Sequence, residues 1–307
     1  MTATAESIQC PLCASERSTT ARSVAAAELV TGWQQLFKID ITDELRDVPR
    51  IDLLVCQECA LQFYVPRTLA GSPRLYEKLQ VFDWYYMAHK WEHDAALEDL
   101  NGASRILEVG CGFGDFVARL RGERGLNAEG VELNARAVEE SQRRGLPVKL
   151  LDVRELARQR PAAYDAVCSF QVLEHLTDPR GVLESACALV KPGGRVLLGV
   201  PNAEGFLKFQ FNLLDMPPHH MTRWSVRAFA NLQRQFPLKL KRFALEPLAA
   251  YHTLDYVDAQ CARLIAGGVP RVLIRGRFKL LAAEVLRWTR VHRLLRGHTL
   301  YVCLERQ

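Results

Sequence analysis

The sequence predicts an α/β fold built on a parallel sheet, and three observations lead to that prediction. From about residue 102 onward, short apolar runs alternate with segments of helical periodicity, an order that implies parallel strands joined by right-handed crossovers. A glycine-rich loop directly follows the first of these runs, and two Cys-x-x-Cys pairs precede the alternating region. We therefore divide the 307 residues into a cysteine-bearing segment (1–66), an aromatic linker (67–101) and an α/β domain (102–307).

A strand, a glycine loop and a helix are predicted from Arg105 to Leu120. Residues 105–109 form a short apolar-rich run, as expected of a buried parallel strand, and residues 110–114 contain three glycines. From Asp115 the apolar residues recur at helical spacing. Glycines let the backbone turn sharply and approach a ligand closely, and a helix start offers unpaired N–H groups. The segment is therefore a candidate binding loop for a polar ligand.

The spacing of the glycines excludes the dinucleotide-binding fingerprint, because its third glycine would fall at Asp115. The pattern is instead Glu-x-Gly-x-Gly-x-Gly, beginning at Glu108. Glu132 ends a second short strand, 18 residues after Gly114. A carboxylate at that place can accept hydrogen bonds from both ribose hydroxyls of a nucleoside. This pattern resembles motif I of the class I S-adenosylmethionine (SAM) methyltransferases.

Later segments strengthen the resemblance. The runs YDAV, VLEHLTDP and LVKPGGRVLLGVPN follow in that order between residues 164 and 202. The resemblance covers about 100 residues and implies a Rossmann-like seven-stranded methyltransferase sheet that binds SAM. Two further strand-like segments, at 238–245 and 298–304, would complete that sheet. A helical insertion is expected between them, at roughly 252–296.

The resemblance also implies which residues contact the cofactor. Asp152 follows the third strand of the domain, where related enzymes often place an acid that accepts the adenine amino group. A solvated loop acid or a helix cap is the alternative for that residue. The full set of expected cofactor-binding residues is Glu108, Gly110, Cys111, Gly112, Gly114, Glu132, Leu133, Asp152, Val153 and Phe170.

Four of the nine cysteines form two knuckle-like turns, Cys10/Cys13 and Cys56/Cys59, separated by 42 residues. Thiolates two residues apart on a tight turn can bind one metal ion, and two such turns complete a tetrahedral site. We predict one structural Zn²⁺ in a small zinc-ribbon-like domain; a redox pair is the alternative. The separation exceeds the usual ribbon length, so a subdomain must be inserted. Ala60 stands where ribbons commonly have glycine.

The composition sets wider limits. The net charge of +5 is modest, and no run approaches the roughly 18 apolar residues of a membrane span. The start, MTATAESIQC, lacks the basic and apolar regions of a secretory signal. An odd number of cysteines with Cys-x-x-Cys pairs fits a reducing compartment better than a disulfide scaffold. We therefore expect a cytoplasmic protein, and its oligomeric state is left open.

The linker is rich in aromatic residues, which could pack between two domains or line the cofactor or substrate cavity. In class I methyltransferases the segment before the first strand commonly lies over the methionine end of the cofactor. Tyr86, Lys90 and His93 would then reach its carboxylate, and Tyr85 and Tyr86 are the expected substrate contacts. The aromatic residues concerned are Tyr76, Phe82, Trp84, Tyr85, Tyr86 and Trp91.

Two histidine-bearing stretches follow the fourth and fifth strands of the domain, where the acceptor should meet the cofactor. One contains Glu174-His175, and the other is PPHHMTRW, with His219, His220 and Arg223. Histidine is the natural general base near neutral pH, so His175, His219 and His220 are the candidate catalytic residues. Arg223 could bind a phosphate or carboxylate of the substrate. Structural roles and metal ligation are the alternatives for the histidines.

The predicted insertion carries a strongly basic segment. Residues 271–296 contain eight arginines or lysines and one acid, Glu284. Apolar residues recur there at helical spacing, at Phe278, Leu281, Val285, Trp288 and Leu295. An amphipathic cap packed on the domain, with a solvated basic face, would explain this pattern. A patch for a phosphorylated substrate or for an anionic membrane surface is the alternative.

These features together predict a SAM-dependent methyltransferase with an N-terminal zinc-binding domain, similar to the deoxysugar C-methyltransferases. The expected acceptor is a small molecule, such as a nucleotide-linked sugar or another glycan precursor, methylated on oxygen or carbon. An RNA methyltransferase with a zinc ribbon and a non-catalytic SAM-binding protein are the alternatives. Nucleic acid is the less expected partner. Residues 169–172 lack the Asn/Asp-Pro-Pro-aromatic run of many enzymes that methylate exocyclic amines of bases.

Overall fold

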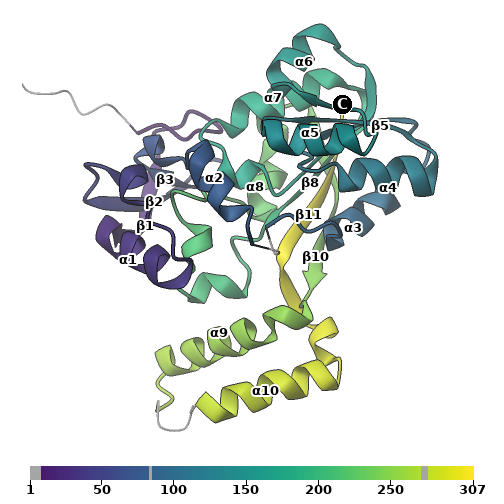
Figure 1. Cartoon of the computed structure of the whole chain (residues 1–307). Helices are drawn as coiled ribbons and strands as arrows, with labels where there is room; N and C mark the ends of the chain where they lie inside the picture. The colour runs from purple at the N-terminus through teal and green to yellow at the C-terminus, as the bar shows by residue number, and fades with distance from the viewer. Residues whose placement is uncertain (1–7, 83–84, 271–275) are drawn as a thin grey trace, which may run out of the picture.

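The computed structural model describes residues 8–82, 85–270 and 276–307. Within these ranges the larger sheet has seven strands in the order β10-β11-β8-β7-β4-β5-β6, with β11 antiparallel to both neighbours and the others parallel (Figure 1). The predicted α/β fold with a seven-stranded sheet is therefore confirmed. The strands are β4 (Arg105–Val109), β5 (Asn127–Glu132), β6 (Val148–Leu150), β7 (Tyr164–Phe170), β8 (Val190–Pro201), β10 (Leu238–Pro247) and β11 (Arg296–Arg306).

Helices connect these strands, and short polar side chains begin several of them. Asn134, Asp152, Asp178 and Ser225 each accept a hydrogen bond from a backbone N–H of the helix that follows, which satisfies a group left unpaired at a helix start. Gly125 ends α4 in the left-handed conformation. The helices are α3 (Trp91–Asp99), α4 (Asp115–Arg124), α5 (Ala135–Arg143), α6 (Val153–Gln159), α7 (Pro179–Leu189) and α8 (Val226–Asn231).

Short 3₁₀ helices occur in the connections. Among the described residues they are η1 (Thr42–Leu45), η2 (Arg67–Leu69), η3 (Leu173–His175), η4 (Phe206–Phe209), η5 (Leu213–Asp215), η6 (Leu232–Arg234), η7 (Ala250–His252) and η9 (Val291–Leu294). His175 is the last residue of η3, and His219 and His220 lie in the connection after η5. η3 follows β7, and η4 and η5 follow β8.

A second, smaller sheet lies beside the first, with strand order β1-β2-β3-β9. The cysteine-bearing segment supplies β1 (Ser18–Ala25), β2 (Arg50–Cys56) and β3 (Gln62–Val65), with α1 (Ala26–Leu36) between β1 and β2. The fourth strand, β9 (Thr222–Arg223), comes from the histidine loop and pairs with β3. The aromatic linker contains α2 (Pro73–Leu79). Its Trp84 lies outside the described residues.

The hydrophobic core joins the two sheets. One cluster unites Leu12, Leu61 and Phe63 of the first segment with Trp224 and Phe229 of the α/β domain. A second cluster packs α1 and β2 against residues that precede the histidines, at 213 and 216. The predicted boundary at residue 66 thus marks a change of sheet along the chain, while the core continues across it.

A helical hairpin occupies the predicted insertion between β10 and β11 and projects from the body (Figure 1). It consists of α9 (Thr253–Ala266) and α10 (Gly276–Trp288), and residues 271–275 lie outside the described ranges. The interpretation of this segment as a cap whose apolar residues pack on the domain is wrong for α10. Phe278, Leu281, Val285 and Trp288 are all exposed. No described helix is long and apolar enough to cross a membrane.

Candidate active site and metal centre

The glycine loop between β4 and α4 needs its glycines for two reasons. Gly110, Gly112 and Gly114 all have positive φ angles, of 71°, 51° and 73°. Residues that carry a Cβ atom rarely adopt such angles. A Cβ atom on Gly110 would also lie 2.5 Å from Cγ2 of Val172, and one on Gly112 would lie 2.9 Å from the ring of Tyr86. The absence of side chains at these glycines therefore lets Val172 and Tyr86 pack directly against the loop backbone.

Glu132 at the end of β5 braces this loop. Its Oε2 accepts a hydrogen bond from the Gly112 N–H at 2.9 Å, and its Oε1 accepts bonds from the N–H groups of Leu133 (2.7 Å) and Asn134 (2.9 Å). An ionised carboxylate offers about four lone-pair positions, so one remains on Oε2 for a ligand hydroxyl. Leu133 contributes its backbone here, while its side chain is exposed.

Glu108 on β4 is a buried carboxyl that lacks a full set of partners. It is 5% exposed, and its Oε2 has no hydrogen-bond partner among the described residues. Burial raises the pKa of Glu108 to about 8, and the nearby charge of Lys90 partly opposes that shift. A buried polar atom without a partner is unfavourable, so a cationic ligand group beside Glu108 would be stabilised.

The two tyrosines predicted to contact substrate lie in different places. The Tyr86 ring lies 4.7 Å from that of Phe113 in the glycine loop, and its hydroxyl accepts a hydrogen bond from Asn134 Nδ2 at 3.4 Å. The Tyr85 ring instead lies 6.2 Å from the His219 ring. Tyr86 therefore covers the cofactor loop, and Tyr85 borders the histidine cluster.

Several other expected cofactor contacts have their side chains elsewhere. Cys111, Val153 and Phe170 are buried in the hydrophobic core. Asp152 caps α6 by accepting the Arg154 N–H at 2.7 Å, as the helix-cap interpretation predicted. His93 stacks on Phe116 in the core, and burial lowers its pKa to about 3. His93 therefore does not point to a cofactor carboxylate.

The three predicted catalytic histidines come together. One ring nitrogen from each of His175, His219 and His220 lies within 4.8 Å of one from each of the others. The rings of His219 and His220 stack, with centroids 4.4 Å apart, and the His175 ring lies 4.8 Å from that of His220. The loops after β7 and β8 thus form one cluster, although 43 residues separate its two parts in the sequence.

The hydrogen bonds of the cluster indicate the tautomers. Nδ1 of His175 lies 2.8 Å from the His219 carbonyl oxygen, and Nδ1 of His219 lies 2.9 Å from that of Leu214. Nδ1 of His220 lies 3.3 Å from Oδ1 of Asp215. Carbonyl and carboxylate oxygens only accept hydrogen bonds, so each Nδ1 carries its proton. Each Nε2 is then left with a lone pair that can accept a proton or bind a metal ion.

Burial keeps these imidazoles neutral. It lowers the pKa of His175 to about 3 and that of His219 well below the ordinary value. Burial also lowers the pKa of His220, but Asp215 opposes this shift by stabilising the protonated ring. Among the three, His220 is the member whose Nδ1 faces a carboxylate oxygen, that of Asp215.

Asp215 is a functional candidate that the sequence analysis did not assign. Burial alone would raise its pKa, but His298 and His220 hold the pKa of Asp215 well below its usual range. His298 Nε2 lies 3.7 Å away, and Arg223 Nη2 lies 3.8 Å away. The only local signal was an acid five residues before His220, because His298 lies far along the chain. Arg223, predicted to bind substrate, is held beside Asp215.

Glu174 is a second such candidate. It is 1% exposed, and neither of its carboxyl oxygens has a hydrogen-bond partner among the described residues. Its Oε1 lies 4.0 Å from Nε2 of His175. Burial raises the pKa of Glu174 to about 8. The carboxyl group therefore lies buried beside the histidines, with hydrogen-bonding capacity that the described residues do not use.

The smaller sheet holds the histidine loop in place. The Tyr64 N–H donates to the Met221 carbonyl oxygen at 3.0 Å, and the Tyr64 hydroxyl donates to the Asp215 carbonyl oxygen at 2.9 Å. On the other side, the Met221 N–H donates to the Glu174 carbonyl oxygen at 2.7 Å. The loop is therefore fixed between β3 and η3, and both histidine stretches share this frame.

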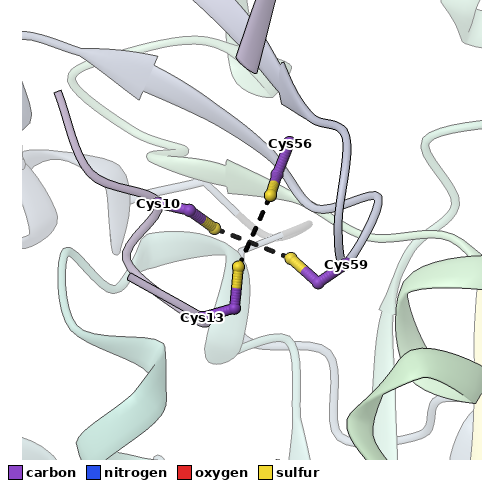
Figure 2. Close-up of side chains that lie close together, drawn as sticks. All are labelled: Cys10, Cys13, Cys56 and Cys59. Carbon is purple, nitrogen blue, oxygen red and sulfur yellow. Dashed lines mark hydrogen bonds between the residues drawn. The ribbon is translucent and has the colours of Figure 1, made fainter. Parts of the chain in front are cut away.

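The two Cys-x-x-Cys turns meet at the other end of the smaller sheet, as Figure 2 shows. Sγ of Cys10 lies 3.6 Å from Sγ of Cys59, and Sγ of Cys13 lies 3.5 Å from Sγ of Cys56. A tetrahedral zinc ion with Zn–S bonds of about 2.3 Å requires sulfurs roughly 3.8 Å apart. A disulfide requires about 2.05 Å. The arrangement fits the predicted Cys₄ zinc site.

Ala60, which stands where ribbons commonly have glycine, adopts a glycine-like backbone conformation. Ala60 has a φ of 64°, in the left-handed region where the usual glycine is favoured, and its N–H donates to the Cys56 carbonyl oxygen at 3.0 Å. The side chains of Arg180 and Asn231 in the α/β domain donate to the carbonyl oxygens of Leu12 and Cys59. The cysteine turns are thereby tied directly to the α/β domain.

Comparison with known proteins places the chain in a family. The family model for a methyltransferase domain matches residues 83–241, which is more than half of the chain. The chain belongs to this methyltransferase family. It is a SAM-dependent methyltransferase, as the glycine-loop pattern implied. The family assignment argues against the alternative of a non-catalytic SAM-binding protein.

Two relatives named as O-methyltransferases agree with this assignment. A ubiquinone biosynthesis O-methyltransferase of Dechloromonas aromatica is 30% identical over 210 residues, covering 55% of this chain and 87% of the relative. The protein of the same name from Chromobacterium violaceum is 27% identical over 179 residues, covering 48% and 77%. A solved SAM-dependent methyltransferase from Archaeoglobus fulgidus matches with a TM-score of 0.44 and 16% identity, covering 69% of this chain and 94% of that one.

The first prediction concerns the role of Glu132 in the methyltransferase. Glu132→Ala should weaken SAM binding by about 1.5–3 kcal/mol, the range for a hydrogen bond to a charged group. Isothermal titration calorimetry with SAM provides the measurement. Glu139→Ala, which removes an exposed carboxylate from the adjacent α5, should leave the affinity unchanged. An unchanged affinity in a folded Glu132→Ala protein would refute the assignment.

The second prediction concerns the metal. Elemental analysis of the purified methyltransferase should give about one zinc per chain, and Cys56→Ser should remove it. SAM affinity should persist, because the glycine loop lies on the larger sheet. Turnover should fall by up to about 10²-fold, because β3 would no longer hold the histidine loop in register.

Cys261→Ser is the matched control, since it changes a buried thiol outside the cluster and should retain the zinc. A metal-free wild-type protein with both cysteine pairs oxidised to disulfides would contradict the zinc assignment. Two ions per chain, with the second lost in His219→Ala, would mean that the imidazoles bind metal.

Proposed function

We propose that this methyltransferase transfers the methyl group of SAM to a hydroxyl oxygen of a small-molecule acceptor. The observation that carries the proposal is the cluster of three neutral imidazoles beyond β7 and β8, with His220 oriented by the buried Asp215. The relatives named as O-methyltransferases support oxygen as the accepting atom. No relative described above is named for a sugar, so the predicted sugar acceptor rests on the sequence resemblance.

The residues around the glycine loop fit SAM. We propose that Glu108 receives the ammonium group of the methionine portion, which would stabilise the ionised carboxylate. Glu132 would accept a hydrogen bond from the ribose, and Asp152 would accept one from the adenine amino group while still capping α6. The backbone of the glycine loop would lie against the cofactor. SAM itself supplies an electrophilic methyl group on a sulfonium.

His220 is the proposed general base. The acceptor hydroxyl would donate its hydrogen bond to Nε2 of His220, and the proton would move to that nitrogen as the oxygen bonds to the methyl carbon. The bond between that carbon and the sulfonium sulfur would break at the same time, and its electron pair would stay on the sulfur of the departing thioether. The negative charge of Asp215 would stabilise the imidazolium that forms, as in other base–carboxylate pairs. His175 is the second choice, because its Nδ1 is fixed by a backbone carbonyl and has no carboxylate behind it.

The substrate contacts follow from the same cluster. Tyr85 is largely buried and borders His219, so we propose that it covers the acceptor. Arg223 is 3.8 Å from Asp215 and would orient an anionic or carbonyl group of the acceptor. Tyr86 is proposed to contact the cofactor instead, since its ring lies on the glycine loop.

The experiment that tests the function is methyl transfer from isotopically labelled SAM into fractionated cell extract. We expect label in a small molecule that resists mild base, as an ether does. Label in RNA, with salt-sensitive RNA binding, would favour the zinc-ribbon RNA methyltransferase instead. Label on carbon of a nucleotide-linked sugar would favour the predicted deoxysugar-type chemistry over O-methylation.

The third prediction tests the histidine cluster. His220→Ala and Asp215→Asn should each lower turnover by about 10²–10⁴-fold, the usual contribution of a general base. SAM affinity should barely change, because neither residue touches the glycine loop. His219→Ala should also lower turnover, because it removes the ring that stacks on His220. If His219→Ala and His220→Ala keep wild-type rates and His175→Ala abolishes activity, His175 is the base instead.

The fourth prediction is the pH profile. The folded protein lowers the pKa of His220 from its ordinary value of about 6.5, so the base stays deprotonated through neutral pH. The ratio kcat/KM should therefore be flat near pH 7 and fall only below about 6.5. Asp215→Asn removes the group that opposes the lowering, so the acidic limb should move to still lower pH. An acidic limb above pH 7 would contradict this account.

A further inference from the structure

Helix α10 exposes an apolar stripe on its outer side. Phe278, Leu281, Val285 and Trp288 are three, four and three residues apart, a spacing that places them on one face of a helix. All four are at least half exposed, and Trp288 is 86% exposed. Scattered exposed apolar residues are common, but an ordered row of large ones marks an interaction surface.

The inner face of α10 already has its partner. Lys279 forms an ion pair with Asp258 of α9 at 2.8 Å, and Ala283 packs in a small cluster with Val257 and Cys261 of α9. The hairpin is thus closed through this inner face. None of the four residues of the outer stripe belongs to that cluster.

The apolar surface continues beyond α10 and is flanked by cations. Val291 is exposed in η9, and Leu294 is 85% exposed. Five exposed arginines accompany the stripe, at positions 277, 287, 290, 293 and 296, against a single acid on α10, Glu284. Arg287 is paired with that acid. A helix with large apolar residues on one side and cations beside them is typical of segments that lie in the interface of an anionic membrane.

We propose that the α9–α10 hairpin docks on an anionic lipid surface, with the outer stripe of α10 in the headgroup region. The hairpin projects from the body in Figure 1, so α10 can meet a flat surface. Anionic headgroups complement the arginines. The same face of a second copy would bring its own arginines against them, and the like charges would repel. Charge therefore favours lipid over a second copy.

The base of the hairpin adjoins the proposed acceptor side. Phe206 of η4 contacts Tyr256 of α9, with ring centroids 5.5 Å apart, and its ring lies 6.2 Å from that of His298. His298 in turn lies beside Asp215. If the proposed function holds, docking would bring the histidine cluster to acceptors that carry an apolar tail in the membrane. This step rests on the proposed function, whereas docking itself does not.

The test is cosedimentation of the full-length protein with vesicles of phosphatidylcholine, with and without phosphatidylglycerol. Binding should require the anionic lipid and weaken in 1 M salt, where the Debye length falls to about 3 Å. The double variant Leu281→Ser, Trp288→Ser should bind on the order of tenfold more weakly per side chain removed. Leu36→Ser, which changes a comparably exposed leucine on α1, is the matched control and should bind like wild type.

Equal binding by the double variant, or no binding by the wild type, would overturn the proposal. A wild-type dimer that the double variant converts to monomer, without vesicle binding, would make a second copy the occupant. Vesicle binding needs neither SAM nor turnover, so its result is independent of the labelled-SAM assay. Calorimetric SAM affinity of the double variant should match wild type, which shows that the variant is folded.

Discussion

The short pairing of β3 with β9 is the contact on which the histidine loop, the proposed acceptor side of this methyltransferase, depends. Gln62 faces Arg223 and Phe63 faces Thr222, so two residue pairs join strands that lie about half the chain apart. β9 directly follows the histidines, and β3 directly follows the second cysteine turn. Each backbone hydrogen bond contributes only about 0.5–1.5 kcal/mol, so two pairs cannot fix a loop alone. Buried Trp224 and Phe63, which share one core cluster, supply the remaining packing.

Burying three imidazoles and several carboxyl groups is costly unless they have partners. In this fold some of these buried groups have partners and others lack them. Asp215 is surrounded by His220, His298 and Arg223. The three clustered imidazoles, His175, His219 and His220, each donate an Nδ1 proton to an oxygen. Glu108 and Glu174 keep unpaired oxygens, and burial raises the pKa of both to about 8. Glu108 on β4 and Glu174 on η3 thus each have a buried oxygen without a hydrogen-bond partner among the described residues. A bound ligand could supply the missing partner at each place.

The sequence alone predicted the parts of the fold that depend on patterns within short segments. Alternating periodicity predicted the α/β sheet, the glycine spacing predicted the loop between β4 and α4, and the cysteine spacing predicted four sulfurs that lie close together. The strand β9 was not predicted, because two residues carry no periodicity and their partner lies far away. The role of Asp215 was missed for the same reason, since His298 reaches it only through the fold. The apolar spacing of α10 predicted one apolar face of a helix. The same spacing is expected whether that face packs on the protein or lies on a membrane.

The two halves of the site rest on different supports. The glycine loop, Glu108 and Glu132 belong to β4, β5 and their connection, which the larger sheet holds by itself. The histidine loop needs both sheets, because its carbonyl groups and its strand bond to β3 and η3. Changes in the cysteine-bearing segment would therefore shift the acceptor-facing loop while the cofactor loop stays in place. Under the proposed function, this division would let the acceptor side vary without loss of the cofactor site. It would also link the four cysteines to catalysis through β3, although they lie outside the histidine cluster.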